Sequence, residues 1–233
     1  MKFRSIFLSL TIVFATHGSI SAQQEISQLP LIAQPSQMDP AKPLVFYITG
    51  DGGWNKFSKA LTQELLDEGF PVVSLDASKY FWSKKTASES ATVVASAINH
   101  FSELWKRNQV IFLGYSFGAD VMPFIYNEAQ KNLKTKVRGI CLLSPSTRTD
   151  FEVHVMEMLG AKSSRGESVV KAINNVNAQM ILLVFGDDEK DFPVQELTVK
   201  NCKTVVLPGG HHYDHATKEV SKIIIQNMDK PGT

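Results

Sequence analysis

The sequence predicts an α/β fold, with a mostly parallel central sheet and helices on both faces. Short apolar runs typical of covered strands alternate with amphipathic stretches typical of helices over most of the chain. Parallel strands need such helical crossovers, so this alternation favours one doubly covered sheet. The 233 residues are enough for one domain of this kind with a sizeable core.

Six apolar runs are predicted to form the strands of this sheet, namely residues 44–48, 71–75, 110–113, 137–143, 180–185 and 203–207. A short edge strand is expected near 29–32. Four stretches with apolar residues at helical spacing are predicted as helices, namely 57–68, 88–106, the stretch from the turn at Ser116 to 131, and 216–228. Residues 146–175 lack such a pattern. There, 151–159 fit either a short helix or a cap over the site, and we expect little or no lid.

The first 22 residues are predicted to be a secretory signal peptide and not part of the fold. They combine a basic start at Lys2 and Arg4 with an apolar stretch at 6–15 and small residues up to Ala22. That stretch is short for a membrane span, and an uncleaved anchor is the alternative. Residues 23–42, polar with scattered prolines, are expected to be an irregular lead-in. Residues 43–230 then form a single domain.

Charge and cysteine content narrow the range of partners. The chain has 24 Lys and Arg against 23 Asp and Glu, without a basic run, so we expect no nucleic-acid partner. Its two cysteines, Cys141 and Cys202, do not have the spacing of metal ligands. An exported chain permits a disulfide between them. Because Cys141 falls in a predicted central strand, two separate thiols are the favoured interpretation.

The central motif is the pentapeptide Gly114-Tyr115-Ser116-Phe117-Gly118, a G-x-S-x-G pattern between a predicted strand and a predicted helix. In this context the serine occupies a sharp, strained turn, and the glycines allow the neighbouring chain to pass closely. The turn lifts the serine oxygen clear of the sheet, at the N-terminus of the following helix. Ser116 is therefore the predicted nucleophile; a tight turn in an unrelated α/β protein is the alternative.

A serine hydroxyl is a weak nucleophile that needs a base, and the base needs an acid to orient it. The chain order serine, acid, histidine is the one expected of the α/β-hydrolase fold. The acid is expected in the acidic loop after the strand at 180–185. Asp188 is our choice, and three other acids of this loop stay open, namely Asp187, Glu189 and Asp191.

Two adjacent histidines follow the last predicted strand, and one of them is the expected base. His211 precedes an aromatic residue by two positions, as many catalytic histidines of this fold do, and is favoured for that reason. The tight turn at Gly209 and Gly210 can instead present His212, so His212 stays an alternative for the base. A zinc site on His211, His212 and His215 is a weaker alternative, because the serine motif already accounts for a base.

Two backbone N–H groups are predicted to hold the oxyanion of the reaction. One belongs to Phe117, directly after the nucleophile, and the other to Asp51, in the glycine-rich loop after the strand at 44–48. This loop lacks the glycine patterns of phosphate-binding loops, so nucleotide binding is not expected.

Four aromatic residues are candidates for the apolar wall of a substrate pocket, namely Trp54, Tyr80, Phe81 and Trp82. They follow predicted strands at the carboxyl edge, where parallel sheets bind their ligands. For the three consecutive aromatics, a role as core filler is the alternative.

Four stretches together resemble the bacterial virulence protein family VirJ/AcvB. They are Thr-Gly-Asp-Gly-Gly-Trp at 49–54, Tyr-Phe-Trp at 80–82, Gly-Tyr-Ser-Phe-Gly-Ala-Asp at 114–120 and Leu-Pro-Gly-Gly-His-His-Tyr-Asp at 207–214. The resemblance runs over residues 43–228. It implies an exported α/β-hydrolase with Ser116 as nucleophile, the histidine pair as base and an acid near Asp188. Tyr213 stands where this family usually has phenylalanine.

These observations predict a periplasmic serine hydrolase that cleaves an acyl ester and uses no metal or cofactor. AcvB-like members of the family are linked to hydrolysis of lysyl-phosphatidylglycerol, an aminoacylated membrane lipid, and VirJ-like members to type IV secretion. The resemblance therefore implies a small ester or an aminoacylated phospholipid as substrate, peripheral membrane contact and secretion-system partners. The alternative is a non-catalytic binding or scaffold protein on the same fold. A peptidase is a weaker third possibility.

Overall fold

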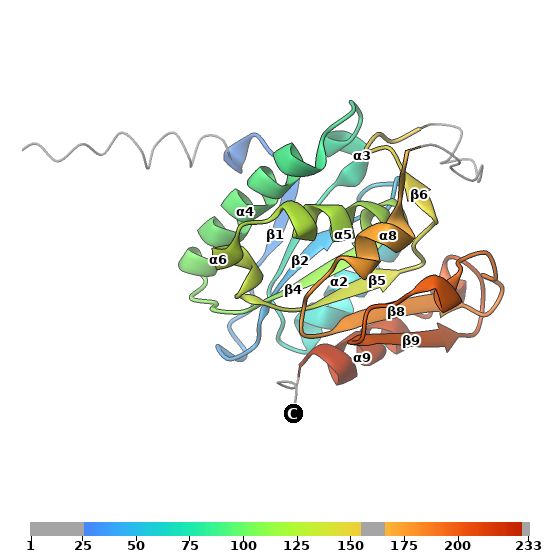
Figure 1. Cartoon of the computed structure of the whole chain (residues 1–233). Helices are drawn as coiled ribbons and strands as arrows, with labels where there is room; N and C mark the ends of the chain where they lie inside the picture. Colours follow the sequence, from blue (N-terminus) through green and yellow to red (C-terminus); the bar gives the residue numbers. More distant parts are fainter. Residues whose placement is uncertain (1–25, 155–165, 230–233) are drawn as a thin grey trace, which may run out of the picture.

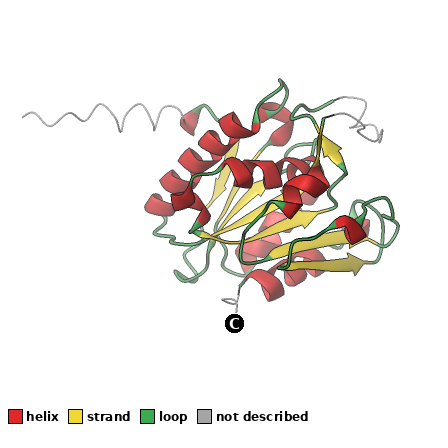
Figure 2. Cartoon of the chain, viewed as in Figure 1, coloured by secondary structure: helices red, strands yellow, loops and turns green. Residues whose placement is uncertain are grey.

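The computed structural model describes residues 26–154 and 166–229. The predicted signal peptide lies outside these residues. Figures 1 and 2 show a twisted central sheet with helices on both faces. In the described part of the chain the sheet has seven strands in the order β1-β3-β2-β4-β5-β8-β9. Their bounds are β1 (Leu31–Gln34), β2 (Leu44–Ile48), β3 (Val72–Leu75), β4 (Val110–Tyr115), β5 (Val137–Leu143), β8 (Ile181–Gly186) and β9 (Cys202–Leu207).

The sheet is parallel except at one edge. The edge strand β1 pairs antiparallel with β3, and every other pair of neighbours in the seven-stranded sheet is parallel. The carboxyl ends of β2, β4, β5, β8 and β9 therefore lie along one edge of the sheet. The predicted α/β architecture with a mostly parallel sheet is confirmed.

Two groups of helices cover the two faces of the sheet. One face carries α4 (Ala87–Leu104), α5 (Phe117–Glu128) and α8 (Val169–Asn174), with the short α3 (Ala77–Tyr80) and α6 (Lys131–Lys134). The other face carries α2 (Lys56–Asp67) and α9 (Thr217–Met228), seen behind the sheet in Figure 1. Each group packs into its own apolar cluster, so the central strands are buried from both sides.

Burial on both faces explains the sequence pattern of the strands. All five residues of β2 have an exposed fraction of 0 %, so the strand has no polar side to alternate with the apolar one. The helices have clear starts. The Asn55 side chain accepts from Ser58 N at 3.0 Å, and Thr86 and Glu89 form a reciprocal capping box at the start of α4.

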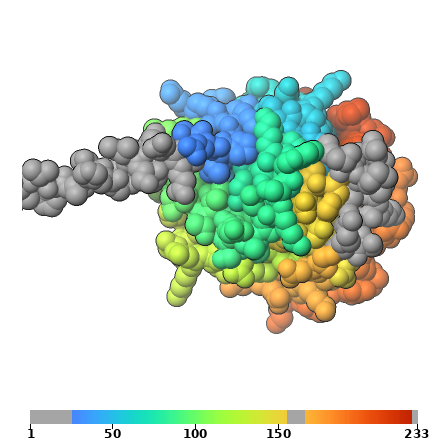
Figure 3. Space-filling view, turned by 90° about the horizontal axis from the view of Figure 1, so that it is seen from above, coloured from blue at the N-terminus to red at the C-terminus, as the bar shows by residue number. Residues whose placement is uncertain are grey.

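Some local structure differs from the predictions. The segment expected to be a loop after β3 contains the one-turn helix α3, and the stretch 146–175 contains α8 and a small two-stranded sheet, β6 (Arg148–Thr149) with β7 (Glu167–Ser168). Of the expected helix or cap at 151–159, residues 151–154 are not helical and the rest lies outside the described residues. Figure 3 shows the green residues of α3 and α4 beside the yellow residues after β5.

The two cysteines are free thiols, with Cys141 buried on β5 and Cys202 half-buried on β9. Strand β8 lies between them. Two steps of about 4.8 Å across a sheet exceed the distance that a disulfide can bridge. Of the helices in the described ranges, none has the length and apolar character needed to cross a membrane.

One arginine ties the lead-in segment to the body of the domain. Arg107, in the connection before β4, is only 5 % exposed. Its guanidinium donates to the carbonyl of Ser36 at 2.6 Å, to that of Lys42 at 3.3 Å and to that of Asp39. These carbonyls compensate the buried cation and fix the chain between β1 and β2.

We expect Arg107→Met to lower the free energy of unfolding by about 2 kcal/mol, because charged hydrogen bonds to three carbonyls are lost. Urea denaturation followed by circular dichroism measures the change. The neighbouring Lys106 is exposed, and Lys106→Met should stay within about 0.5 kcal/mol of wild type. Equal stabilities of the two variants would contradict this role of Arg107.

Candidate active site

The turn between β4 and α5 holds Ser116 in a strained conformation. Its φ of 52° and ψ of −122° are rare for a residue with a side chain. Added Cβ atoms on the flanking glycines would collide with backbone. On Gly114 the Cβ would lie 2.5 Å from the Gly118 carbonyl oxygen, and on Gly118 it would lie 2.1 Å from that of Ile48. The G-x-S-x-G spacing is thus required by packing.

The glycine-rich loop after β2 lies directly against the serine. A Cβ on Gly50 would come within 3.3 Å of both Ser116 Cβ and the Tyr115 ring. Gly53, at a φ of +65°, leaves room for the side chain of Ser78, which an added Cβ would approach to 2.3 Å. The loop is therefore held between α3 and the serine turn.

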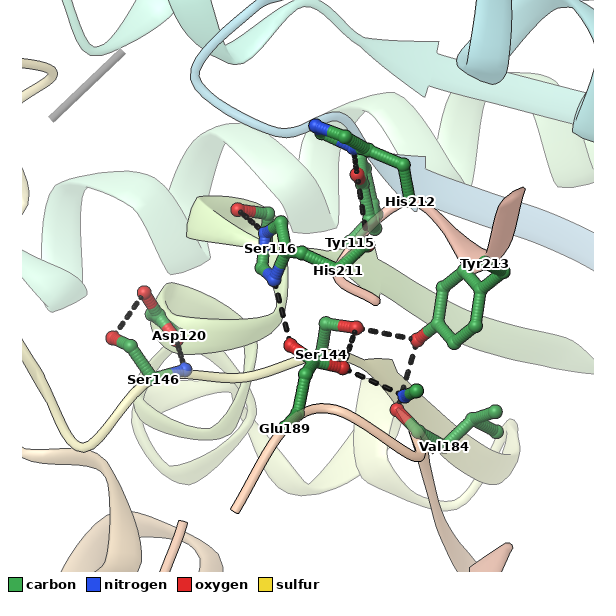
Figure 4. A network of polar contacts seen from close by, with 11 residues as sticks. Tyr115, Ser116, Asp120, Ser144, Ser146, Val184, Glu189, His211, His212 and Tyr213 are labelled. Atoms are coloured by element: carbon green, nitrogen blue, oxygen red, sulfur yellow. Dashed lines mark hydrogen bonds and ion pairs between the residues drawn. The ribbon is translucent and has the colours of Figure 1, made fainter. Parts of the chain in front are cut away.

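His211 connects the serine to a carboxylate, as Figure 4 shows. Its Nε2 lies 2.8 Å from Ser116 Oγ, and its Nδ1 lies 2.7 Å from Glu189 Oε1. With Nδ1–H donating to the carboxylate, the lone pair on Nε2 faces the serine hydroxyl. The side chain of His211 is 43 % exposed and that of Glu189 is 19 % exposed. These contacts have the geometry of a nucleophile, a base and an orienting acid.

The choice of Asp188 as the acid is wrong. Its side chain is exposed, and the contact with His211 is made by Glu189. Asp187 is occupied elsewhere, because its Oδ1 accepts from Gly209 N at 3.0 Å. Glu189 lies one residue beyond Asp188 in the turn. Its side chain is longer than that of an aspartate and folds back, so that Oε2 also accepts from Gly186 N at 2.7 Å. Glutamate is an accepted alternative at this position of the fold.

Two further groups support Glu189. Its Oε2 lies 2.7 Å from Ser144 Oγ, which itself lies 2.7 Å from the Tyr213 hydroxyl. The Tyr213 hydroxyl also lies 2.9 Å from the Val184 carbonyl oxygen. Burial alone would raise the pKa of Glu189, but hydrogen bonds from His211, Ser144 and the Gly186 amide outweigh it and lower the pKa below its usual value.

Sequence reasoning did not identify Ser144 and Tyr213 as parts of the site. Ser144 directly follows β5 with a φ of 50°, and Tyr213 begins a run of three residues with positive φ. Tyr213 is completely buried. A serine at the carboxyl end of a central strand is a usable signal, but nothing in the sequence pairs it with a tyrosine 69 residues later.

His212 has a different partner from His211. Its Nδ1 is hydrogen-bonded to the hydroxyl of Tyr115, and the same hydroxyl lies 3.2 Å from the His211 carbonyl oxygen. Partial burial and the nearby His211 and His215 lower the pKa of His212, so it is neutral at pH 7. Among the described residues no group of three His, Cys, Asp or Glu side chains is arranged to hold a metal ion.

The two predicted oxyanion donors remain available. Within the described ranges, the backbone N–H groups of Phe117 and Asp51 donate to no other residue. Phe117 starts α5, so its N–H is one of the free donors at a helix N-terminus. The packing of Gly50 on Ser116 brings the Asp51 loop to the same turn.

The predicted aromatic wall needs one correction. Phe81 is completely buried, with its ring 5.1 Å from that of Phe117, so it supports the serine turn from the core and cannot line a pocket. Tyr80 is half-buried against it, and Trp82 is 63 % exposed. Trp54 packs partly against the cluster under α2 and α9. The roles of Tyr80, Trp82 and Trp54 in substrate binding stay predictions.

A second carboxylate lies next to the serine turn and binds the chain that follows β5. Asp120, in the first turn of α5, accepts from Ser146 N at 2.6 Å and from Ser146 Oγ at 2.7 Å (Figure 4). These bonds fasten the chain after β5 to α5, the helix that begins directly after Ser116.

The sheet, the strained serine turn and the relay from Ser116 through His211 to Glu189 define the α/β-hydrolase fold with a serine-type site. Solved structures of this fold are similar over most of their length. Est1E from Butyrivibrio proteoclasticus is 18 % identical, with a TM-score of 0.60 over 86 % of this chain and 93 % of the other. A lipase-esterase related protein from Clostridium acetobutylicum is 17 % identical, with a TM-score of 0.61 over 86 % and 99 %.

MenH from S. aureus is 11 % identical, with a TM-score of 0.60 over 86 % of this chain and 98 % of the other. At these identities the likeness is one of fold. The model of the bacterial virulence protein (VirJ) family matches residues 42–231. The chain belongs to this family, as the resemblance of its motifs implied. A search of curated proteins found no match.

The acid can be identified by paired substitutions. We expect Glu189→Gln to lower kcat/KM for a soluble ester by about a thousandfold or more, because the amide neither orients His211 in the same way nor stabilises its cation. Asp188→Asn, in the same loop, should change kcat/KM less than about threefold. A larger loss for Asp188→Asn than for Glu189→Gln would return the role to Asp188.

The Ser144 hydroxyl should set the pH dependence of the site. Ser144→Ala removes a donor to the carboxylate, so the pKa of Glu189 rises and the acid limb of the kcat/KM profile moves to higher pH. Tyr213→Phe, which keeps that donor, should shift the limb less. Identical profiles for Ser144→Ala and wild type would contradict this role.

Proposed function

We propose that this protein is a serine hydrolase that cleaves acyl esters. The observation that carries the proposal is the continuous relay Ser116 Oγ to His211 Nε2 at 2.8 Å and His211 Nδ1 to Glu189 Oε1 at 2.7 Å. A relay of this kind on a strained strand-to-helix turn has one chemical use that fits all its parts, namely activation of the serine for attack on a carbonyl carbon.

In the first half of the reaction, Ser116 Oγ attacks the ester carbonyl while His211 Nε2 takes its proton. Glu189, held by Ser144 and the Gly186 amide, stabilises the imidazolium. The N–H groups of Phe117 and Asp51 receive the oxyanion. His211 then gives its proton to the leaving alcohol, and the acyl group remains on the serine.

In the second half, water replaces the alcohol. His211 takes a proton from the water as it attacks the acyl-enzyme, and the same two N–H groups hold the second oxyanion. Return of the proton to Ser116 releases the acid and restores the resting state. The exposed position of His211 supports this step, because water reaches the base directly.

The finer proposal concerns the substrate and its compartment. From the family resemblance we propose an aminoacyl ester such as that of lysyl-phosphatidylglycerol, met at the periplasmic face of a membrane through peripheral contact. A link to virulence or type IV secretion, with secretion-system proteins as partners, belongs to the same proposal. The family match over residues 42–231 supports it at the level of the family.

A fluorophosphonate probe and a soluble p-nitrophenyl ester test the catalytic proposal. Wild type should be labelled at Ser116 and hydrolyse the ester, whereas Ser116→Ala should lose the label and at least about a thousandfold of kcat/KM. Ser88, an exposed serine of α4, provides the control, and Ser88→Ala should match wild type. Folded wild type that neither reacts with the probe nor turns over the ester would favour the binding or scaffold protein.

The substrate is tested separately by release of lysine from vesicles that contain lysyl-phosphatidylglycerol. Wild type should release lysine, and Ser116→Ala should not. Hydrolysis of the soluble ester without release of lysine would reject the lipid substrate and leave the esterase proposal standing.

A further inference from the structure

His212 lies next to the catalytic base but takes no part in the relay. The centroids of the His211 and His212 rings are 5.5 Å apart, and the His212 ring is exposed at the surface beside the site. Within the described ranges, its side chain makes one hydrogen bond, between Nδ1 and the Tyr115 hydroxyl. Figure 4 shows the second nitrogen, Nε2, at the opposite end of the ring, pointing away from Tyr115.

The protons of this cluster can be assigned by counting. The Tyr115 hydroxyl has one proton and two contacts, His212 Nδ1 and the His211 carbonyl oxygen at 3.2 Å. A carbonyl oxygen only accepts, so the Tyr115 hydroxyl donates a hydrogen bond to the His211 carbonyl oxygen. The contact with His212 is then a hydrogen bond only if His212 Nδ1–H donates to the tyrosine oxygen. This assignment satisfies both contacts of a largely buried hydroxyl.

The assignment leaves a lone pair on His212 Nε2, because a neutral imidazole carries only one proton. The neutral state is supported by the lowered pKa of His212. The ring therefore offers a hydrogen-bond acceptor to any molecule that occupies the site. Tyr115 belongs to β4 and precedes Ser116 directly, so the acceptor is fixed relative to the nucleophile by a buried strand.

We propose that His212 Nε2 is a specificity subsite, which accepts a hydrogen bond from a hydroxyl or ammonium donor next to the scissile ester. This inference rests on the proposed esterase function and deepens it by naming a class of substrate. The carboxylates of Asp51 and Glu189 both act electrostatically on His212, and they favour a donor, above all a cationic one, over an acceptor at this place. Plain alkyl esters do not use the subsite.

The first experiment measures the tautomer without any turnover. In wild type at neutral pH, 15N NMR of the histidine side chains should show His212 protonated at Nδ1 and unprotonated at Nε2. Tyr115→Phe removes the acceptor for Nδ1–H and should let His212 take the other tautomer. Protonation of His212 at Nε2 in wild type would overturn the subsite, whatever the enzyme hydrolyses.

The second experiment compares three small esters. Ethyl acetate carries no donor, 2-hydroxyethyl acetate carries a hydroxyl on the alcohol side, and glycine ethyl ester carries an ammonium on the acyl side. For wild type we expect kcat/KM to favour at least one donor-bearing ester, and His212→Ala should lower its ratio to ethyl acetate by about tenfold, the loss of one hydrogen bond. A lowered ratio for 2-hydroxyethyl acetate would identify a hydroxyl as the donor, and a lowered ratio for glycine ethyl ester would identify an ammonium.

The neighbouring His215 supplies a matched control, because it is exposed and lies in the same loop. His215→Ala should keep the wild-type ratio. An unchanged ratio in His212→Ala would overturn the subsite while the esterase function stands. No hydrolysis of any ester by wild type, together with no fluorophosphonate labelling, would overturn both.

Discussion

The close packing around the strained serine turn is the constraint on which the rest of the site depends. Ser116 keeps its positive φ because β4 and α5 are held by contacts that leave no room for a side chain at Gly114 or Gly118. The carbonyl of Ile48, at the end of β2, touches that same turn. The buried central strands therefore supply the free energy that keeps one half-buried serine in an unfavourable conformation.

Glu189 and His211 come from two loops that the sheet forces together. The loops follow the adjacent strands β8 and β9, and a Cβ on Gly186 would lie 2.3 Å from the Gly209 carbonyl oxygen. Ser144, at the end of β5, joins both loops because it contacts Glu189 from one and Tyr213 from the other. The positions of Glu189 and His211 are thus set as a unit relative to β5, which also neighbours the strand β4 that leads to Ser116.

The fold and the strained turn at Ser116 could be predicted from the sequence because their signals are local. An apolar run such as 44–48 identifies a covered strand, and G-x-S-x-G between a strand and a helix identifies the turn. The acid could not be singled out among four candidates, since the reach of Glu189 depends on how its turn folds back on Gly186. For Phe81 the choice between pocket wall and core filler could not be made for a similar reason, because it depends on the one-turn helix α3, which precedes Phe81 and brings its ring into the core.

The adjacent histidines show how a partner decides the role of an imidazole. Both rings are assigned a proton on Nδ1 and a lone pair on Nε2, so the tautomer does not distinguish them. The two rings differ in the group that accepts the hydrogen bond from Nδ1. A carboxylate stabilises the cation that forms when His211 takes a proton, whereas the neutral Tyr115 hydroxyl offers His212 no such compensation. Partial burial and the nearby His211 and His215 further disfavour a charge on His212. His211, whose Nε2 also lies 2.8 Å from Ser116 Oγ, is thus the base in the proposed reaction, and His212 is left to offer its lone pair as a hydrogen-bond acceptor.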